Sequence, residues 1–487
     1  MTTENSKIDG TQNIPLLVDL DGALIRTDTL FETTIIFLKE NPLSFYLLFV
    51  WFLKGKQVLK RELARRTELN VDSLPVNNEV FQYLEQQHQN GRKIVLCTGS
   101  WFEIAEKIAQ RFPFVDQIIA TDDQRNLTGS VKAENATQLW GKHNYDYLGN
   151  EDKDMVVWKS ARRALVVGDN DLGSAAGQVA EVEKHFIVDR VGIKTWVKAI
   201  RVHQWAKNGL LFVPLLVSQK FLQYDAVLEV MLAYISFCLC ASATYLLNDL
   251  MDLESDRKHA IKKSRPLAAG LIAIPNAVVV IVLLLMIGLG LPLLLLNTAF
   301  FVALLCYLTL TILYSFRLKR LQTVDVIVLA SLFTIRVVAG AVVIDVILSF
   351  WLLSFSMFMF LSLALVKRVS ELIHVEKGSK KRSKKISGRG YFTADIVILQ
   401  SLGGTAGFMS VLVFALYINS PEVVKLYRQP EVLWFMVPVI GYWIMRIWII
   451  TARGEMDEDP ISYAIKNKNS WAVALITLLV LAIAITI

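Results

Sequence analysis

The sequence contains few cysteines and histidines, and neither residue type has the spacing of a structural site. Its 487 residues include four cysteines and six histidines. The cysteines lie in apolar surroundings without paired spacing, which excludes a disulfide framework and a zinc site. The opening segment MTTENSKIDG is polar and lacks an apolar run, so we expect no signal peptide. Only 20% of the residues are charged, yet 54% are hydrophobic, which excludes a disordered or collagen-like chain.

The apolar residues are distributed unevenly along the chain. Up to about residue 200 the sequence has the composition of a soluble domain, whereas long apolar runs separated by basic clusters recur from residue 206 onward. We therefore predict an N-terminal tail over 1–13, a soluble domain over 14–190, a linker over 191–205 and a membrane domain over 206–487.

Short apolar runs alternate with helical patterns in the soluble part. Strands are expected at 16–20, 93–97, 115–120, 145–148 and 164–167, with helices such as 78–89 and 101–111 between them. This alternation predicts a Rossmann-like α/β fold with a parallel sheet. Residues 29–72 form an insertion whose aromatic run, 42–53, is too short to cross a bilayer. We interpret that run either as a cap helix touching the membrane surface or as a buried core helix.

Apolar stretches near 208–219, 226–247, 272–292, 296–314, 324–344, 347–366, 395–418, 431–450 and 470–487 predict an all-α polytopic bundle of about nine spans. Alternate connections carry roughly twenty Lys and Arg residues, against about three in the others. The positive-inside rule then places the soluble domain on the cytoplasmic side of a bacterial inner membrane. The basic residues, including the run 377–389, are expected to face lipid headgroups, with no nucleic acid as partner.

Acidic residues are clustered where the second apolar stretch ends. Asp249, Asp252 and Asp256 are spaced to share one helical face, next to Asn248. Such carboxylates repel one another, and a divalent cation relieves the repulsion. Mg²⁺ prefers a few carboxylates together with substrate phosphate oxygens, which suits a diphosphate donor. Basic residues that would neutralise a departing diphosphate follow: Lys262, Lys263 and Arg265.

The pattern Asn248-Asp-x-x-Asp-x-x-x-Asp256 resembles the first aspartate-rich motif of the UbiA prenyltransferase superfamily, intramembrane Mg²⁺-dependent enzymes that use a polyprenyl substrate. The resemblance covers about residues 195–487. Other segments are similar to the decaprenyl-phosphate phosphoribosyltransferase branch, although Val202 replaces a usual proline: Arg201 to Asn208, Tyr314 to Lys319 with Asp325, Arg336 to Gly340, Lys367-Arg368 with Glu371, and Arg453 to Pro460.

One departure from the superfamily bears on the substrate. Members that prenylate aromatic acceptors carry a second aspartate pair, but here Asp325 is followed four residues later by Leu329. The resemblance then implies a donor with extra phosphate, such as phosphoribosyl pyrophosphate, and a polyprenyl phosphate acceptor. It implies Asp249, Asp252 and Asp256 as catalytic Mg²⁺ ligands, and these substrate-binding residues: Lys207, Asn208, Asn248, Lys262, Arg265, Tyr314, Arg317, Lys319, Asp325, Arg336, Lys367 and Arg368.

Three alternatives remain open for this half of the chain. Lys367 and Arg368 lie at a helix end, where long basic side chains also extend to the headgroups without a role in binding. The enzyme would transfer a prenyl group to an aromatic or other small acceptor if its donor were a prenyl diphosphate. A lipid-binding scaffold with decayed sites is the third alternative. Chain length of the lipid and oligomeric state do not follow from the sequence.

Two carboxylates follow the first predicted strand, in Asp19-Leu-Asp21-Gly22. The carboxyl end of a parallel strand is where α/β sheets build their sites, and such a pair supplies a nucleophile and a general acid. A second strand ends in Thr98-Gly-Ser. Together these motifs resemble the haloacid dehalogenase (HAD) phosphatase superfamily over about residues 14–190.

The HAD resemblance implies that Asp19 is the nucleophile, Asp21 the acid and base, Thr98 a phosphate binder and Lys132 the neutralising lysine. Lys142 is a weaker candidate for the last role. It also implies that Mg²⁺ is held by Asp19, Asp21, Asn150 and Asp154, with Asn150 replacing the usual first aspartate of Gly149 to Asp154. Gly168-Asp-Asn-Asp171 competes as that motif. Ala23 stands where threonine is common, so either an active phosphatase or a binding relic is consistent with the residues.

Overall fold

The computed structural model describes residues 14–377, 389–456 and 459–486, so the predicted tail 1–13 lies outside the described residues. The chain forms two compact units. The first contains the residues up to 200 together with 245–281, and the second contains 201–244 and 282–487. The segment 245–281 was predicted as part of the membrane domain. The aspartate-rich motif thus belongs to the same unit as the α/β domain.

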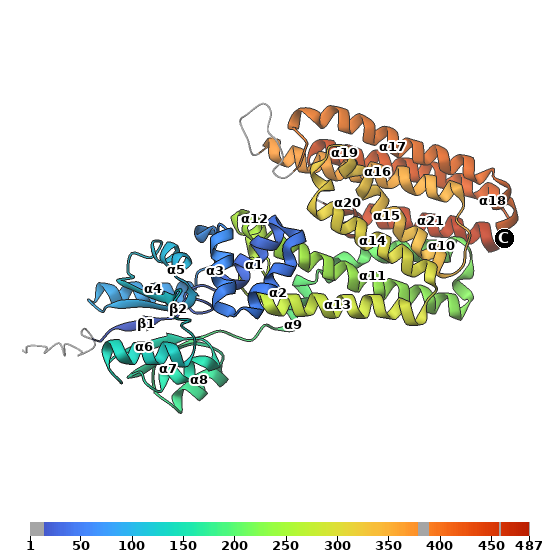
Figure 1. Ribbon diagram of the computed structural model, residues 1–487. Coiled ribbons are helices and arrows are strands. Elements are labelled where there is room, and N and C mark those ends of the chain that lie inside the picture. Colours follow the sequence, from blue (N-terminus) through green and yellow to red (C-terminus); the bar gives the residue numbers. More distant parts are fainter. Residues whose placement is uncertain (1–13, 378–388, 457–458, 487) are drawn as a thin grey trace, which may run out of the picture. The chain divides into compact units, whose positions relative to one another are not determined.

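A six-stranded parallel sheet forms the centre of the first unit. Its order is β3 (Gln117–Thr121), β2 (Ile94–Trp101), β1 (Leu16–Val18), β4 (Asp146–Gly149), β5 (Arg163–Gly168) and β6 (Glu181–Ile187). Leu16 and Val18 of β1 pack in one hydrophobic core, and Leu17 packs in another on the opposite face. Helices cover both faces: α4 (Asn78–Gln89) and α5 (Phe102–Ala109) one, and α6 (Ser130–Trp140), α7 (Met155–Trp158) and α8 (Asn170–Gly177) the other (Figure 1). The predicted Rossmann-like fold is confirmed.

The sequence analysis did not predict strand β6. Its residues, EVEKHFI, are mostly charged or polar, and only Phe186 is buried. β6 pairs with β5 alone, at the edge of the sheet. An edge strand is exposed along one side, so it lacks the continuous apolar run by which the inner strands are recognised.

The predicted insertion forms three helices: α1 (Thr29–Glu40), α2 (Phe45–Leu53) and α3 (Lys56–Arg66). The Asp28 carboxylate caps α1 by accepting hydrogen bonds from two backbone amides of its first turn. Phe37, Trp51, Leu59 and Leu63 pack together where the three helices meet. Trp51 is the only buried residue of α2. The interpretation of 42–53 as a buried core helix is therefore wrong.

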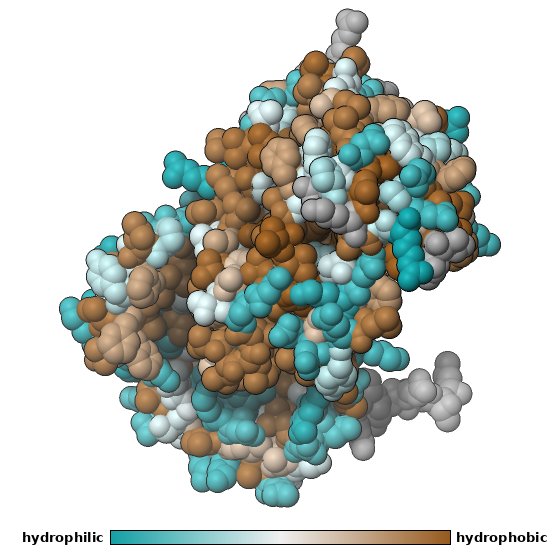
Figure 2. All heavy atoms as spheres, turned by 90° about the vertical axis from the view of Figure 1, so that its right-hand side faces the viewer, coloured by the Kyte–Doolittle hydropathy of each residue, from teal (hydrophilic) through white to brown (hydrophobic). Residues whose placement is uncertain are grey.

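Eight helical segments among the described residues are long and apolar enough to cross a membrane. Five are single helices: α11 (Tyr224–Met251), α13 (Ile274–Leu295), α14 (Thr298–Phe316), α15 (Val324–Val343) and α16 (Phe350–Lys377). The other three are Thr393–Ile418, which contains α17 (Ile396–Ile418), Pro430–Arg453, which contains α19 (Met436–Arg453), and Lys468–Ile485, which lies in α21 (Lys468–Thr486). The stretch 208–219 instead forms a 3₁₀ helix, η4 (Val202–Phe212), and the five-residue α10 (Val213–Val217). The polytopic helical class is confirmed. Apolar side chains cover much of the face seen in Figure 2, as lipid contact requires.

Candidate active sites

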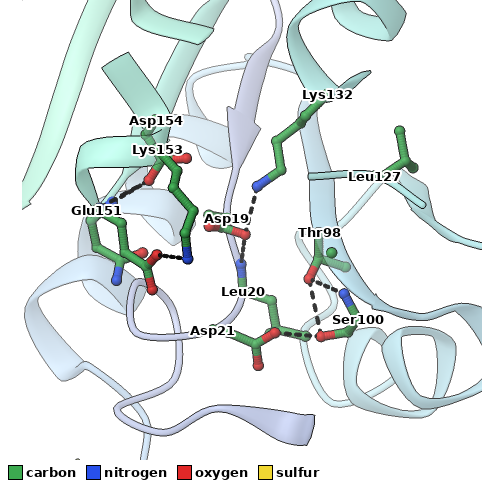
Figure 3. A network of polar contacts seen from close by, with 12 residues as sticks. Asp19, Leu20, Asp21, Thr98, Ser100, Leu127, Lys132, Glu151, Lys153 and Asp154 are labelled. Carbon is green, nitrogen blue, oxygen red and sulfur yellow. Dashed lines mark hydrogen bonds and ion pairs between the residues drawn. The ribbon is translucent and has the colours of Figure 1, made fainter. Parts of the chain in front are cut away.

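A cavity of about 180 Å³ lies in the first unit, where the predicted catalytic residues of the α/β domain meet. β1 runs directly into Asp19 and Asp21, and the last residues of β2 and the segment after β4 contribute further lining residues. Figure 3 shows these side chains pointing toward one another. Since β1 lies between β2 and β4, the cavity occupies the position at which parallel α/β sheets bind ligands.

The Asp19 carboxylate is paired with Lys132, as the sequence analysis predicted. Lys132 Nζ lies 3.0 Å from Asp19 Oδ1 and donates a hydrogen bond of 2.8 Å to the Tyr147 hydroxyl. Burial raises the pKa of Asp19 to about 7, and the carboxylates of Asp154 and Asp21 add to this rise while Lys132 opposes it. Lys142, the weaker candidate, is exposed. The structure thus brings Lys132, and not Lys142, to the first aspartate.

Asp21 accepts hydrogen bonds from Ser100 and Thr29, neither of which the sequence analysis assigned to this aspartate. The Ser100 hydroxyl lies 2.5 Å from Asp21 Oδ2, and the Thr29 amide donates to Asp21 Oδ1 at 2.8 Å. Burial, followed by the charge of Asp28, raises the pKa of Asp21 to about 7. A carboxyl group that titrates near neutrality suits general acid and base chemistry.

Thr98, the predicted phosphate binder, is fully buried and does not line the cavity. Its hydroxyl accepts a hydrogen bond of 3.0 Å from the Ser100 amide. Ser100, two residues later, presents its hydroxyl to the cavity instead (Figure 3). The Thr-Gly-Ser motif correctly indicated this position of the site. The residue of the motif that lines the cavity is Ser100 rather than Thr98.

The structure separates the two competing acidic motifs. Asp154 is buried and lines the cavity, where its Oδ1 accepts a hydrogen bond of 2.8 Å from Tyr147 and its Oδ2 accepts from the amides of Asn150 and Glu151. Asp169 instead caps α8 and pairs with Arg190 at 2.6 Å. Of the two motifs, it is therefore Gly149 to Asp154 that contributes acidic side chains to the cavity.

The insertion also contributes to this cavity through α3, which the sequence analysis did not foresee. Lys56 and Lys60 line the cavity. Lys60 Nζ donates hydrogen bonds to the Gly99 carbonyl at 2.6 Å and to Asn126 Oδ1 at 3.0 Å. Burial lowers the pKa of Lys60. Cationic groups from the insertion and from α6 thus surround the two aspartates, as an anionic substrate requires.

The aspartate-rich segment forms a second polar cluster in the first unit. Arg265 Nη1 lies 3.1 Å from Asp249 Oδ1 and forms an ion pair with Asp256 as well. Both carboxylates are buried. Asp252 lies between α11 and α12 (Leu253–Lys258), so the helix is interrupted within the motif. Asp249 and Asp256 nevertheless converge on one guanidinium, which shows that a single cation can neutralise both. Arg265 was predicted to bind diphosphate.

A buried ion pair connects this segment with the α/β domain. Arg257 donates hydrogen bonds of 3.1 and 2.6 Å from its two terminal nitrogens to Glu32 of α1. Both side chains are about 95% buried, with exposed fractions of 6% and 5%. The backbone carbonyl of Ala268 and the hydroxyl of Thr27 complete the network. Arg257 adjoins Asp256 in the chain, so the α/β domain contacts the residue beside the motif.

In the second unit, Asp325 is the centre of an arginine-rich cluster. Asp325 Oδ2 lies 2.8 Å from Arg368 Nε, and Oδ1 accepts a hydrogen bond of 2.8 Å from the Tyr314 hydroxyl. Arg389 lies 3.3 Å from Asp325 Oδ1 and 3.4 Å from Glu371. Arg368 also pairs with Glu371.

This cluster changes two sequence predictions. Arg389 was assigned to a solvated loop, most of which, 378–388, lies outside the described residues. It is instead a partner of Asp325, which sequence distance did not reveal. Arg368 is fully buried, so its interpretation as a side chain that extends to the headgroups is wrong. Arg317, predicted to stand beside Tyr314, is exposed at the end of α14, and Lys319 follows in η7 (Leu318–Arg320).

Arg336 and Asn208 meet within the second unit. Arg336 Nε donates a hydrogen bond of 2.8 Å to Asn208 Oδ1, and Nη2 donates one of 3.0 Å to the Tyr307 hydroxyl. Gly340, one turn later on α15, permits this packing: a Cβ there would lie 2.1 Å from the Leu211 carbonyl oxygen. The segments Arg201 to Asn208 and Arg336 to Gly340 therefore lie in contact with each other.

Lys207 forms an ion pair with Asp459, and Lys367 lies close enough to influence both charges. Asp459 was recognised only as part of the segment Arg453 to Pro460, of which 457–458 lie outside the described residues.

Lys262 is partly exposed and Lys263 exposed in the segment after α12. Asn248, on the last turn of α11, is partly exposed.

The oxygen atoms of the cavity and of the aspartate-rich segment suit a hard cation such as Mg²⁺, although they are not already grouped as a metal site. Within the described ranges, no three His, Cys, Asp or Glu side chains are grouped to hold a metal ion. Asn150 Oδ1, however, is buried without a hydrogen-bond partner in the described part of the chain. Its amide lies against Gly22, where an added Cβ would approach Asn150 Nδ2 to 2.3 Å. The unpaired Asn150 carbonyl oxygen near Asp21, and the convergence of two carboxylates on Arg265, fit oxygen coordination.

Comparisons with known proteins agree with both halves of this description. The model of the UbiA prenyltransferase family matches residues 211–472, and that of haloacid dehalogenase-like hydrolases matches 16–143. An uncharacterized protein, y4nM, of Sinorhizobium fredii is 33% identical over 95% of this chain and 89% of its own length. The nodulation protein NoeC of Azorhizobium caulinodans is 31% identical over 58% of this chain and 90% of its own.

The decaprenyl-phosphate phosphoribosyltransferase of Mycolicibacterium smegmatis is 30% identical over 56% of this chain and 86% of its own length. A family model that covers more than half of the chain, and a full-length relative such as y4nM, are sufficient to assign the family. The chain is therefore an integral membrane enzyme that belongs to the UbiA prenyltransferase family and carries a HAD-like domain at its N-terminal end.

Proposed function

We propose that this protein is a bifunctional, Mg²⁺-dependent membrane enzyme that transfers 5-phosphoribose from phosphoribosyl pyrophosphate to a polyprenyl phosphate and then removes the 5-phosphate. The observation that carries the transferase is the pair of buried carboxylates, Asp249 and Asp256, that share one cation at the end of a candidate span. Similarity to a decaprenyl-phosphate phosphoribosyltransferase supports the choice of substrates. The uneven distribution of Lys and Arg between alternate connections supports a protein of the bacterial inner membrane whose HAD-like domain lies on the cytoplasmic side.

In the transferase step, an oxygen of the lipid phosphate attacks ribose C1. The bond from C1 to the pyrophosphate oxygen breaks, and pyrophosphate leaves with the bonding electrons. Asp249, Asp252 and Asp256 would hold Mg²⁺, which neutralises charge on the leaving group. The chain's remaining task is to position two anionic substrates and compensate their charge.

The arginine cluster supports a donor richer in phosphate than a prenyl diphosphate. Asp325 lacks the second carboxylate of an aspartate pair, because Leu329 occupies that position. Arg368 and Arg389 surround Asp325 instead. A site with one carboxylate fewer and two guanidinium groups nearby favours the binding of phosphate over the binding of a metal ion.

In the phosphatase step, an Asp19 oxygen attacks the phosphorus of the 5-phosphate. The phosphorus–oxygen ester bond breaks, and Asp21 donates its proton to the ribosyl oxygen. A water molecule then hydrolyses the phosphoaspartate, with Asp21 as base. Asp19, Asp21, Asn150 and Asp154 would hold Mg²⁺, which would shield the phosphoryl charge from the nucleophile. Lys132 orients Asp19 through their contact of 3.0 Å.

The experiment uses the full chain in nanodiscs with polyprenyl phosphate, Mg²⁺ and phosphoribosyl pyrophosphate labelled with ¹⁴C in the ribose and ³²P at the 5-phosphate. Transfer places ¹⁴C in the lipid fraction, and dephosphorylation removes ³²P from that lipid while ¹⁴C remains. A wild-type protein that labels no lipid contradicts the transferase. Lipid that keeps both labels at the initial ratio contradicts the phosphatase.

A matched incubation with a labelled prenyl diphosphate and hydroxybenzoate tests the runner-up reaction. Formation of labelled prenyl hydroxybenzoate, together with the absence of ¹⁴C-ribosyl lipid in the first experiment, would show that the enzyme is a prenyltransferase. The control for the transferase site is Asp225→Ala, which removes an exposed aspartate from the first turn of α11, the helix that also contains Asp249.

A further inference from the structure

Helix α2 presents an apolar, aromatic surface to the surroundings. Within the sequence FYLLFVWFL, one face consists of Phe45, Tyr46, Phe49, Phe52 and Leu53. Their exposed fractions lie between 51% and 69%, and Leu43 in the turn before the helix is 87% exposed. Burying so many large apolar side chains in water-free surroundings is favourable, so an exposed patch of this kind marks a binding surface.

The opposite face of α2 explains why the helix keeps this orientation. Trp51 is buried against Phe37, and Leu47 and Leu48 pack against the same cluster. Arg66 of α3 lies over the Trp51 ring at 5.0 Å. The inner face is therefore anchored, and the outer aromatic side chains cannot turn inward without breaking that packing.

We propose that the outer face of α2 inserts into the headgroup boundary of the bilayer and seats the HAD-like domain there. The described residues include eight candidate spans, so the protein is embedded in a bilayer. Nine residues rise about 14 Å, too little to cross a hydrocarbon core of about 30 Å but enough to lie in its surface. Tyr side chains are enriched at this depth, and Phe and Leu side chains form the apolar face of helices that lie in the interface.

Charges beside α2 match a membrane surface. Lys39, in the last turn of α1, and Lys54, directly after α2, are exposed, with Glu40 as the one acid between them. Lysines next to a shallow apolar helix are attracted to anionic headgroups, and their long side chains reach the phosphates. A bilayer satisfies both the apolar face and the basic flanks.

The consequence for the HAD-like domain follows from the connection between α2 and α3. Gly55, with φ of +116°, turns the chain between these helices. The next residues of the chain, through Lys60, include both cavity lysines of α3, and Lys60 contacts Gly99. If α2 lies in the headgroups, the cap helices that border the cavity are held at the membrane surface. A phosphate group carried by a lipid is exposed at that same surface. This consequence, unlike the docking itself, rests on the proposed phosphatase.

The docking is tested by depth-dependent fluorescence quenching in the full chain. Cys306 is the exposed one of four cysteines, so Cys306→Ser leaves an introduced cysteine as the accessible thiol. Phe49→Cys and, separately, Phe45→Cys are labelled with NBD and placed in nanodiscs that contain anionic lipid with or without doxyl-labelled chains. Leu139→Cys on α6 is the control, because Leu139 is 53% exposed and apolar but lies on another helix.

We expect quenching of about twofold or more at positions 45 and 49 and little at 139. Quenching at 45 and 49 no stronger than at 139 overturns the proposal. NBD emission that changes with protein concentration but not with doxyl lipid also overturns it, in favour of a second copy of the chain as occupant.

A second measurement separates docking from catalysis. The triple substitution F45S/F49S/F52S is expected to lower hydrolysis of a bilayer-borne phospholipid monoester about tenfold while leaving hydrolysis of p-nitrophenyl phosphate within about twofold of wild type. Equal loss on both substrates would contradict a docking role. Quenching needs no turnover, so it decides the docking even if the domain proves inactive and the proposed phosphatase fails.

Discussion

The α/β cavity and the helical unit place their buried acids in opposite situations. In the cavity, Asp19 and Asp21 line open space, and burial raises the pKa of each to about 7. In the helical unit, Asp325 is fully buried and has Arg368, Arg389 and Tyr314 as partners. The carboxyl ends of parallel strands present their acids to a cavity that a substrate can enter, whereas packed helices require that each buried charge be compensated. Removal of an acid should therefore cost activity in the first region and stability in the second.

The largest effect is expected for Asp19→Asn. An amide is a poor nucleophile, so release of ³²P from labelled lipid should fall by about four orders of magnitude. The overall fold should survive, because Asn keeps the volume of Asp. Transfer of ¹⁴C-ribose to lipid, measured in the same reaction, should remain. Simultaneous loss of both activities would show that the two sites are not separate.

Asp252→Ala should lower ¹⁴C-ribosyl transfer by about three orders of magnitude, or roughly 4 kcal/mol in the activation barrier, if the aspartates hold Mg²⁺. The initial rate is measured over a range of Mg²⁺ concentrations. Asp225→Ala should match the wild type. A lipid-binding scaffold would tolerate both substitutions equally, which would remove the enzymatic interpretation of this segment.

Arg368→Met tests the opposite behaviour in the helical unit. It leaves the fully buried Asp325 without its closest arginine and should destabilise the protein by about 3 kcal/mol. The midpoint of thermal unfolding in detergent reports the loss. The double variant R368M/D325L should recover much of it, because no unpaired charge remains. Arg317→Met is the matched control, since that arginine is exposed.

Glu32→Gln should weaken the connection between α1 and Arg257 by about 2 kcal/mol, because the amide cannot accept both guanidinium hydrogen bonds of a buried pair. Faster hydrogen exchange of residues 265–271, next to the Ala268 carbonyl that Arg257 also contacts, would report local opening. Glu40→Gln, at the exposed end of α1, should leave exchange unchanged. Equal exchange in the two variants would show that the ion pair contributes nothing to this contact.

The smallest effect is expected for Asp171→Asn, with less than about 0.5 kcal/mol in stability and no change in ³²P release. Asp171 pairs with Arg190 at the surface and does not line the cavity. Asp154→Asn should instead reduce ³²P release strongly, since Asp154 lies beside Asp19. A larger loss of ³²P release in Asp171→Asn than in Asp154→Asn would show that Gly168–Asp171 is the acidic motif of the site.

Several elements could be anticipated because their signals are local. The inner strands β1, β2, β4 and β5 are recognised by short apolar runs, and α4 begins and ends where its pattern does, at Asn78–Gln89. Lys132 was chosen over Lys142 by its motif alone. The stretch 208–219 was counted among the predicted spans, about nine in number, but it is short, contains Pro214 and forms η4 and α10 instead.

The sequence by itself determined the two-part character of this protein: a run of about twenty apolar residues has few alternatives to a membrane helix, and acids after a buried strand have few alternatives to a sheet edge. Only the tertiary structure decided which distant side chains meet, such as Arg389 with Asp325, Arg257 with Glu32, and Ser100 rather than Thr98 with Asp21. Periodicity reports the face on which a residue lies. The partner on that face depends on how elements far apart in the chain pack together.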